Sequence, residues 1–229
     1  NREYLWKRRV EIMFVKELTT AISKDFILLL RKPEILLSTL LLATAISLAN
    51  SLLLLQVGDV PLERVAGSLS LALLMSSVWL VSHLRSIDRD EEAGLMLAFL
   101  GVSPGNIFLA RVIVTSLVLF LAWCWILVCH IMFWRVDLPI EGVLCGAISG
   151  IAFTSLAGLC AQLTANCRSR EVALPLLFFP FSVPLSIFLY STLNMVIGNT
   201  SEVDFSLLGL STVIVFSSSW LLADLFDFR

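Results

Sequence analysis

Six runs of apolar residues, each long enough to cross a lipid bilayer, constrain this chain more than any other feature of its sequence. About 20 consecutive apolar residues in a helix span the hydrocarbon core, and a soluble fold cannot bury six such runs. Charged residues make up only 15% of the chain, whereas an ordinary soluble domain holds about 25%. The sequence therefore predicts an all-α polytopic membrane protein with about six transmembrane helices, at 35–57, 66–84, 106–134, 142–165, 173–197 and 205–225.

The segment before the first run is amphipathic. Over 11–32 apolar residues recur at helical spacing, while Lys16, Lys24 and Arg31 lie on the other side, and Pro33 ends the pattern. This pattern favours a helix that lies in the membrane surface; the alternative is a soluble helix packed on a partner. The sequence thus divides into an interfacial N-terminal segment, 1–33, and a six-helix membrane domain, 34–229.

The placement of the basic residues predicts the orientation. Fourteen of the sixteen Lys and Arg residues lie in the N-terminal segment, in or just after the 83–104 loop, in the 166–171 loop or at Arg229, and only Arg64 and Arg135 lie opposite. Cytoplasmic segments of membrane proteins are enriched in Lys and Arg. We therefore expect both termini in the cytoplasm.

The 83–104 stretch is the only long charged interruption between apolar runs, and it follows the order of a short helix. Acidic residues come first, an apolar body follows, and Gly101 and Pro104 end it. The stretch is either a solvated loop or a docking element for a soluble partner. If that partner hydrolyses ATP, a cytoplasmic coupling loop at 85–104 would pass its movement to the second and third spans through Asp88, Asp90, Glu91, Glu92, Gly94, Leu95, Leu97 and Phe99.

Two of the spans carry regular patterns of their own. In the fourth span, Gly142, Gly146, Gly150 and Gly158 lie on nearly one face, which indicates close helix packing inside the subunit or between subunits. The fifth span contains prolines that each remove a backbone hydrogen bond, so we expect a kink or break that is either architectural or a hinge. These prolines are Pro175, Pro180 and Pro184.

No pattern for catalysis is present. The sequence lacks a nucleophile with a base, paired carboxylates, metal-ligand spacing and a phosphate-binding loop, so an enzyme is not expected. The five cysteines read as small apolar residues. Of the two histidines, His130 with Trp134 is the better candidate for a heme contact, but the aromatic residues around it, Trp123 and Trp125 among them, favour an aromatic belt at the membrane interface.

Several segments resemble the heme exporter protein B (CcmB) family, the permeases of the ABC system for cytochrome c maturation. The resemblance rests on Lys16–Leu18, Arg31–Glu34, the stretch Asp88–Leu95 with Ser103–Pro104, and Arg168–Pro184, in which Arg168, Arg170 and Glu171 form a cytoplasmic loop leading into a Leu/Pro-rich span. It covers the chain from about Val15 to the C-terminus. The chain departs from the family at Met96, where a Glu is usual.

The resemblance implies a multi-pass subunit of the bacterial inner (plasma) membrane. It implies a separate CcmA-like ATPase subunit that binds ATP, a CcmC-like heme-handling membrane protein, a small membrane partner and a homo- or hetero-oligomeric complex in the lipid bilayer. Heme is then a candidate cargo and is not a tightly bound cofactor, and no nucleic acid is involved. Two alternatives stay open: an ABC export permease for another hydrophobic cargo such as a lipid or drug, and a non-transporting scaffold of an assembly complex.

Overall fold

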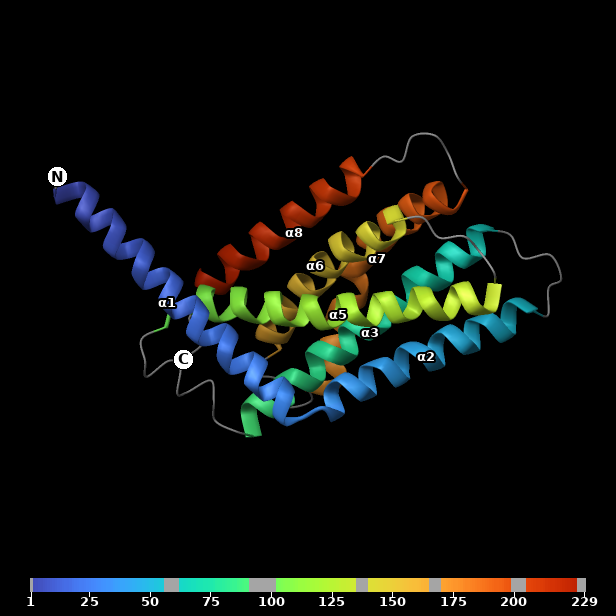
Figure 1. Cartoon of the computed structure of the whole chain (residues 1–229), viewed down its shortest axis with the longest axis horizontal. Helices are drawn as coiled ribbons and strands as arrows, with labels where there is room; N and C mark the ends of the chain where they lie inside the picture. Colours follow the sequence, from blue (N-terminus) through green and yellow to red (C-terminus); the bar gives the residue numbers. More distant parts are fainter. Residues whose placement is uncertain are drawn as a thin grey trace.

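The computed structural model describes residues 2–55, 62–90, 102–134, 140–164, 170–198 and 205–225, with side chains for 14–53, 63–83, 102–133, 140–164, 172–198 and 205–223. These residues are helical almost throughout (Figure 1). The helices are α1 (Arg2–Arg31), α2 (Glu34–Leu55), α3 (Leu62–Asp90), α5 (Pro104–Trp134), α6 (Ile140–Leu163), α7 (Arg170–Ile197) and α8 (Ser206–Leu225).

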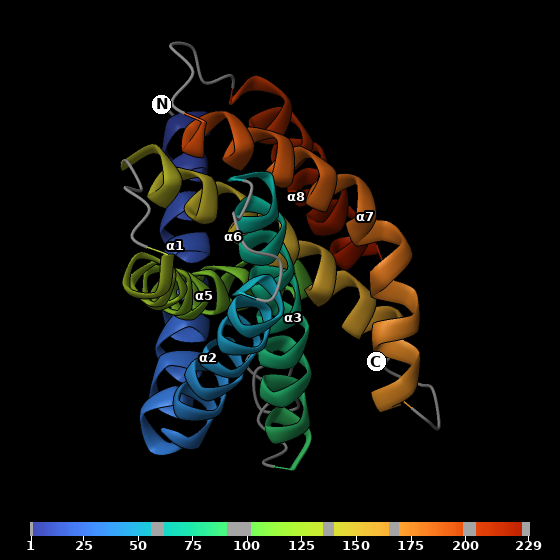
Figure 2. The ribbon, with the colours of Figure 1, turned by 90° about the vertical axis from the view of Figure 1, so that its right-hand side faces the viewer.

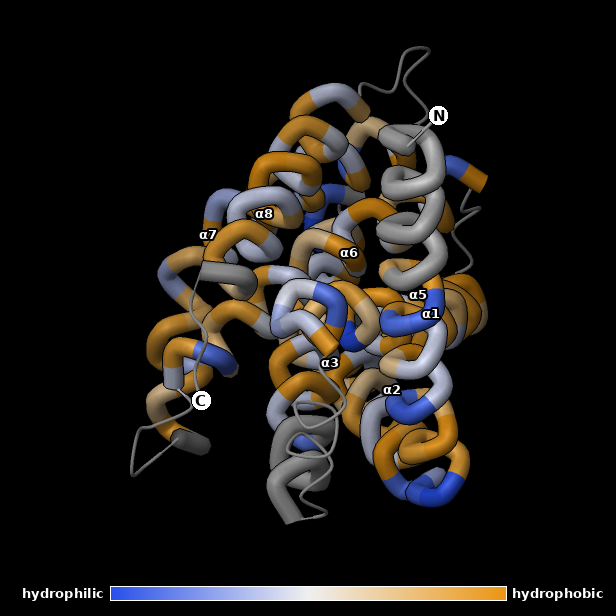
Figure 3. The backbone as a smooth tube through the Cα atoms, turned by 90° about the vertical axis from the view of Figure 1, so that its left-hand side faces the viewer, coloured by the Kyte–Doolittle hydropathy of each residue, from blue (hydrophilic) through white to orange (hydrophobic). Residues whose placement is uncertain are grey.

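The predicted fold class is confirmed. Six of these helices, α2, α3, α5, α6, α7 and α8, are long and apolar enough to cross a membrane, and each coincides with one predicted span. In Figure 3 apolar segments run along these helices, while hydrophilic segments recur along α1. The end of α1 and the start of α2 are separated only by Lys32 and Pro33, which is where the sequence divides the two segments.

Two helix boundaries differ most from the sequence prediction. Helix α1 begins at Arg2 rather than near residue 11, and α3 continues to Asp90 rather than ending at residue 84. Neither the 2–10 nor the 85–90 segment contains Gly or Pro, the residues that most strongly stop a helix. Residues 85–90, which the sequence assigned to the coupling loop, therefore extend the second span as helix.

The bundle has an inner and an outer layer. Helices α3 and α6 are the most buried of the spans, and they pack on each other and on α5. Helix α2 packs on α3 and α5, while α7 and α8 pack on α6 (Figures 1 and 2). These three outer helices expose most of their apolar side chains. Because an outer apolar surface of this extent suits lipid contact, the layering is that of a membrane-embedded bundle.

The predicted glycine face of α6 packs inside the subunit. Trp123 of α5 is fully buried and lies directly over Gly146, so close that a Cβ atom at position 146 would overlap the indole ring. The indole Nε1–H donates a hydrogen bond to the carbonyl of Gly142 at 3.1 Å. Gly158 likewise leaves room for the side chain of Phe108, because a Cβ atom at position 158 would lie only 3.0 Å from the Phe108 ring. These glycines let α5 approach α6 closely.

Trp123 is therefore not part of an aromatic belt at the membrane interface, which was one interpretation of the sequence. Trp125 fits such a belt better, because its side chain is 46% exposed. Trp125 Nε1–H donates to Thr44 Oγ1 at 2.9 Å, and Trp79 Nε1–H donates to Ser38 Oγ at 3.3 Å. The two tryptophans thus tie the outer helix α2 to α5 and α3.

Helix α7 stays continuous through its three prolines. Pro180 and Pro184 lie on the exposed side of the helix, opposite the buried Phe178 and Leu189. Proline rings bend a helix away from the side on which they lie, and Figure 2 shows α7 curving around the bundle. The prolines therefore bend α7 without breaking it.

Candidate functional site at the junction of α1 and α5

The N-terminus of α5 is capped and lies at one end of the bundle. Helix α5 begins at Pro104, and the preceding Ser103 accepts a hydrogen bond from the backbone N–H of Asn106 at its side-chain Oγ, 3.3 Å away. Serine before a helix and proline at its first position are both favourable, because the serine oxygen satisfies an otherwise unpaired N–H and proline has none to satisfy. The sequence Ser-Pro-Gly-Asn thus fixes where the third span starts.

The N-terminal helix reaches this start through a polar contact. The side-chain amide of Asn106 donates a hydrogen bond to Glu17 Oε2 at 2.8 Å, although the two residues are 89 positions apart in the sequence. Asn106 is itself buried, with 4% of its surface exposed. A hydrogen bond with an ionised acceptor is among the stronger ones in proteins. It therefore holds α1 against the first turn of α5.

A buried carboxylate lies further along the same side of α1. Asp25 is buried, and its negative charge acts on Arg111, which lies seven residues into α5. Lys24 Nζ is 3.2 Å from the same carboxylate. A charge in an apolar environment is costly unless an opposite charge compensates it. Arg111, which the sequence alone placed within snorkelling distance of the membrane surface, is stabilised in its charged form by the negative charge of Asp25 on α1.

These contacts form what we call the polar clamp, made of Glu17, Asp25, Asn106 and Arg111. It lies at the end of the bundle where α3 stops, α5 begins and α8 ends (Figure 1). Its groups can hold and orient two helices. Within the part of the chain that the structure describes, no three His, Cys, Asp or Glu side chains lie close enough to bind a metal ion.

The predicted coupling residues flank this clamp in the sequence. Asp88 and Asp90 lie in the last turns of α3, and their side chains are outside the described residues. Glu91, Glu92, Gly94, Leu95, Leu97 and Phe99 fall wholly outside them, and the coupling role of all eight residues stays a prediction. The described chain resumes at Val102, directly before the cap at Ser103.

The second loop motif is described only in part. Arg168 lies outside the described residues, whereas Arg170 and Glu171 form the first turn of α7 without described side chains. Their role in a cytoplasmic loop stays a prediction.

His130 is enclosed by the protein. It is fully buried, its Nδ1 lies 2.9 Å from the backbone carbonyl of Ile126, and its Nε2 lies 3.0 Å from Ser68 Oγ of α3. Because a carbonyl can only accept, Nδ1 carries the hydrogen, and in the neutral ring Nε2 accepts from the Ser68 hydroxyl. A heme iron could bind His130 only after this bond breaks. The side chain of Trp134, its predicted companion, is outside the described residues.

The sequence prediction missed the polar clamp. Glu17, Asp25 and Asn106 stood out neither by motif nor by spacing, and Arg111 was noted only for its depth. A usable signal was the position of Asp25, which lies four residues after Ala21 and three before Leu28, so that all three share one helical face. All three are buried. An acidic residue in line with small and apolar ones indicates a polar partner on a neighbouring helix.

Comparison of the chain with protein-family models, with curated proteins and with solved structures gave no match. The six apolar helices of membrane-spanning length define the class of the protein, an all-α multi-pass membrane protein. The resemblance to the heme exporter protein B family rests on the sequence motifs alone.

Proposed function

We propose that this chain is the membrane-spanning permease subunit of an ABC transporter complex that acts in heme export and heme-chaperone handling for cytochrome c maturation. In this proposal ATP hydrolysis takes place in a separate CcmA-like subunit, and the chain itself is not an enzyme. The further partners are a CcmC-like heme-handling protein and a small membrane protein. The complex lies in the bacterial inner membrane, with both termini of this chain in the cytoplasm.

The observation that carries the proposal is the way the acidic loop joins two of the inner helices. Helix α3 runs without a break to Asp90, and α5 starts at a capped turn only a few residues after the loop. A helix transmits a displacement along its length better than an irregular segment does, because its backbone hydrogen bonds keep it stiff. A partner that binds 91–100 would therefore act directly on α3 and α5.

The inner helices are also the ones that such a movement must reach. Both α3 and α5 pack on α6, and α6 packs on α7 and α8. Displacing the loop would thus reach every span through helix contacts that are already present. This arrangement supports a coupling role for the loop whether the cargo is heme or another hydrophobic molecule.

The proposal is tested by purifying the complex with its co-expressed partners and recording heme absorbance together with ATPase activity. We expect Glu91→Ala with Glu92→Ala to lower ATP-dependent function while insertion and fold survive, because acidic residues in a segment predicted to face water should contribute little to stability. Glu202→Ala with Asp204→Ala is the matched control, since it removes two acids from a connection predicted on the opposite side. If the amount of the Glu91/Glu92 variant in the membrane falls as much as its ATP-dependent function, while the control variant is retained, the loop charges are structural.

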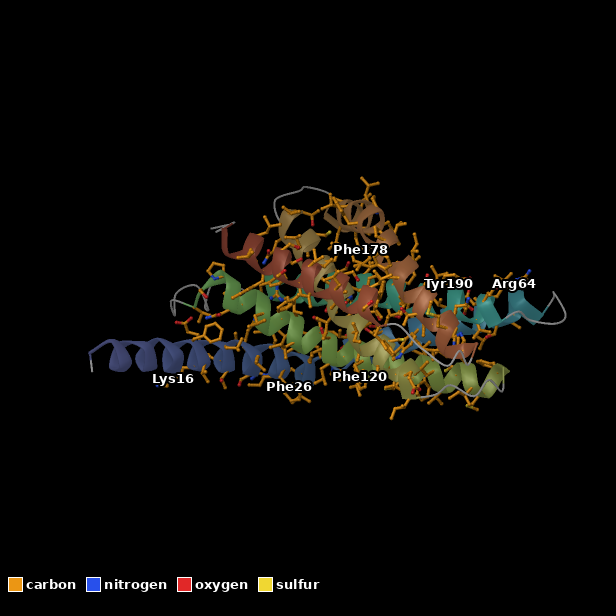
Figure 4. The ribbon with its side chains drawn as sticks, turned by 90° about the horizontal axis from the view of Figure 1, so that it is seen from above. Lys16, Phe26, Arg64, Phe120, Phe178 and Tyr190 are labelled. Atoms are coloured by element: carbon orange, nitrogen blue, oxygen red, sulfur yellow. The ribbon has the colours of Figure 1, made fainter. Side chains whose placement is uncertain are left out.

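One observation favours the scaffold as a second candidate function. The largest fully buried side chains include Trp123, Phe153 and Phe178, which all belong to one continuous hydrophobic core. Phe178 of α7 lies 6.4 Å from Phe153 of α6, measured between ring centres (Figure 4). A core packed with large side chains suits a subunit that holds a complex together. Vesicles containing the whole complex distinguish the two: transport of heme across the bilayer on ATP addition contradicts the scaffold.

A further inference from the structure

Helix α2 contacts the bundle through small and polar side chains. Its buried residues recur every four positions, so they form one side of the helix, and this side faces α3 and α5. After Ile35, these residues are Thr39, Ala43, Ser47 and Ser51. We call the contact of this side with α3 and α5 the α2 seam. Small side chains either let helices pack tightly or leave room that water can enter.

Polar groups buried at the α2 seam lack hydrogen-bond partners. Ser47 is fully buried, and its hydroxyl oxygen bonds to no protein group that the structure describes. The same holds for the buried side-chain amide nitrogen of Asn50, about one turn further along α2. Most other buried hydroxyls bond to a carbonyl of their own helix, as Thr39 does to Ile35 at 2.7 Å. A buried polar atom without a protein partner is costly, and a bound water is the usual remedy.

Helix α3 adds a third unpaired group on its side of the seam. Ser76 is fully buried, and its hydroxyl oxygen also has no partner among the described residues. It lies one turn before Trp79, whose indole donates to Ser38 of α2, and so it belongs to the side of α3 nearest α2. Helices α2 and α3 run in opposite directions (Figure 1), which places Ser76 closer than Ser47 to the start of α2. The unpaired groups are therefore spread along the α2 seam.

Little beyond two tryptophan hydrogen bonds and the packing of small side chains holds the seam closed. Trp79 donates to Ser38 at 3.3 Å and Trp125 to Thr44 at 2.9 Å, and both tryptophan side chains are exposed. A neutral hydrogen bond contributes modestly to stability. Lipid tails are as apolar as the bundle, so the apolar residues of α2 gain no hydrophobic stabilisation from contact with it. Separating α2 from α3 and α5 is therefore inexpensive.

We propose that the α2 seam opens to water within the membrane, and that Ser47, Asn50 and Ser76 bind the water it admits. The crevice so formed lies beside the hydrophobic core, which large side chains fill. A tight, dry contact between small side chains is the alternative that the test must separate from it. The inference does not depend on the proposed transport role.

Ser47 and Leu48 provide a matched pair for the test. They are adjacent and lie at nearly the same depth, but Ser47 is fully buried in the seam whereas Leu48 is 41% exposed on the outside of the bundle. Ser47→Cys and Leu48→Cys are each placed, in the full chain, in phosphatidylcholine nanodiscs. Reaction with (trimethylammonium)ethyl methanethiosulfonate is followed at each cysteine by mass spectrometry. The reagent attacks the thiolate, which apolar surroundings disfavour, so we expect the buried position 47 to react several-fold faster than position 48.

Two results would overturn the proposal. Reaction as slow at position 47 as at position 48 would mean that the seam is dry, and faster reaction at position 48 would mean that water reaches only the outside of α2. Native Cys145 is fully buried in α6 and should stay unreactive, so it reports whether each variant keeps its fold. Should Ser47→Cys misfold, Ser51→Cys and Leu52→Cys give the same comparison, because these residues are 3% and 55% exposed.

The opening of the seam is tested by adding a second change to Ser47→Cys. Thr44→Val removes the acceptor of the Trp125 hydrogen bond and should raise the rate at position 47 several-fold. Thr192→Val is the control, since the Thr192 hydroxyl bonds to a carbonyl of its own helix, α7, at 2.9 Å. Asn50→Leu should slow the reaction, because it replaces a water-binding amide with an apolar side chain. A rate that neither Thr44→Val nor Asn50→Leu alters in folded protein would contradict the proposal.

Discussion

At the scale of single residues, two buried contacts account for how the inner helices fit together. Trp123 packs against Gly146 and donates to the Gly142 carbonyl, and His130 pairs with Ser68. Both contacts join α5 to another inner helix. Interiors are packed closely enough that a change of one or two carbon atoms at such positions is felt. These residues therefore allow the fold to be tested by small substitutions.

We predict that Gly146→Leu destabilises the protein by about 1–3 kcal/mol, because the added side chain must displace the Trp123 indole. The measurement is the thermal unfolding midpoint of the purified protein in detergent. Gly150→Ala is the control, since a Cβ at position 150 meets Leu119 at an ordinary contact distance of 3.8 Å. A variant at position 146 as stable as the control would show that α5 and α6 are further apart than described.

A second prediction concerns the hydrogen-bonded pair Ser68 and His130, in which His130 lies near the C-terminal end of α5. Ser68→Ala should cost about 1–3 kcal/mol of stability, because it leaves Nε2 of the buried His130 without a donor. Adding His130→Phe should cost less than the sum of the two single changes, since the pair is then lost together. Unfolding midpoints of the four proteins measure the coupling. Strict additivity would mean that the two side chains do not interact.

At the scale of helices, the shape of α7 and the position of α1 matter most. The prolines of α7 bend it around the bundle, and the polar clamp holds α1 on α5. For α7 the sequence offered a kink or a break, and the structure is a continuous helix. Its hinge role stays a prediction, but its buried side packs on α6 and α3 along the helix, which favours an architectural bend.

We expect Pro180→Ala to keep the fold and to slow amide hydrogen exchange around Leu176 and position 180. The alanine N–H can donate to the Leu176 carbonyl, which the proline ring leaves without its usual partner. If the bend is architectural, ATP-dependent function of the complex is retained. A large loss of that function at unchanged stability would instead identify Pro180 as part of a hinge.

Most of the helices could be predicted from sequence, because hydrocarbon thickness sets their length and leaves the backbone few alternatives. Their contacts could be predicted only in part. The glycines of α6 indicated close packing, yet nothing in the sequence pointed to Trp123 as the side chain that fills the space. The polar clamp was missed because Glu17 and Asn106 are far apart in sequence, and a single chain carries no record of which distant residues meet.

At the scale of the whole molecule, the protein is a layered bundle with α1 across one end. The six spans return the chain to the end at which it starts, so α1 and the end of α8 lie on the same side (Figure 1). Helix α3 ends and α5 begins at that end too. The proposed function therefore requires that the 91–101 segment face the compartment that contains ATP.

Labelling from either side of the membrane tests this orientation most directly. Single cysteines replace Glu92 and Thr200 in a chain whose Cys167 is changed to Ser, and a membrane-impermeant maleimide is added to sealed inside-out and right-side-out vesicles. The account predicts that position 92 reacts only from the cytoplasmic face and position 200 only from the opposite face. Reaction of position 92 from the exterior would contradict it, because no ATP-hydrolysing subunit could then reach the loop.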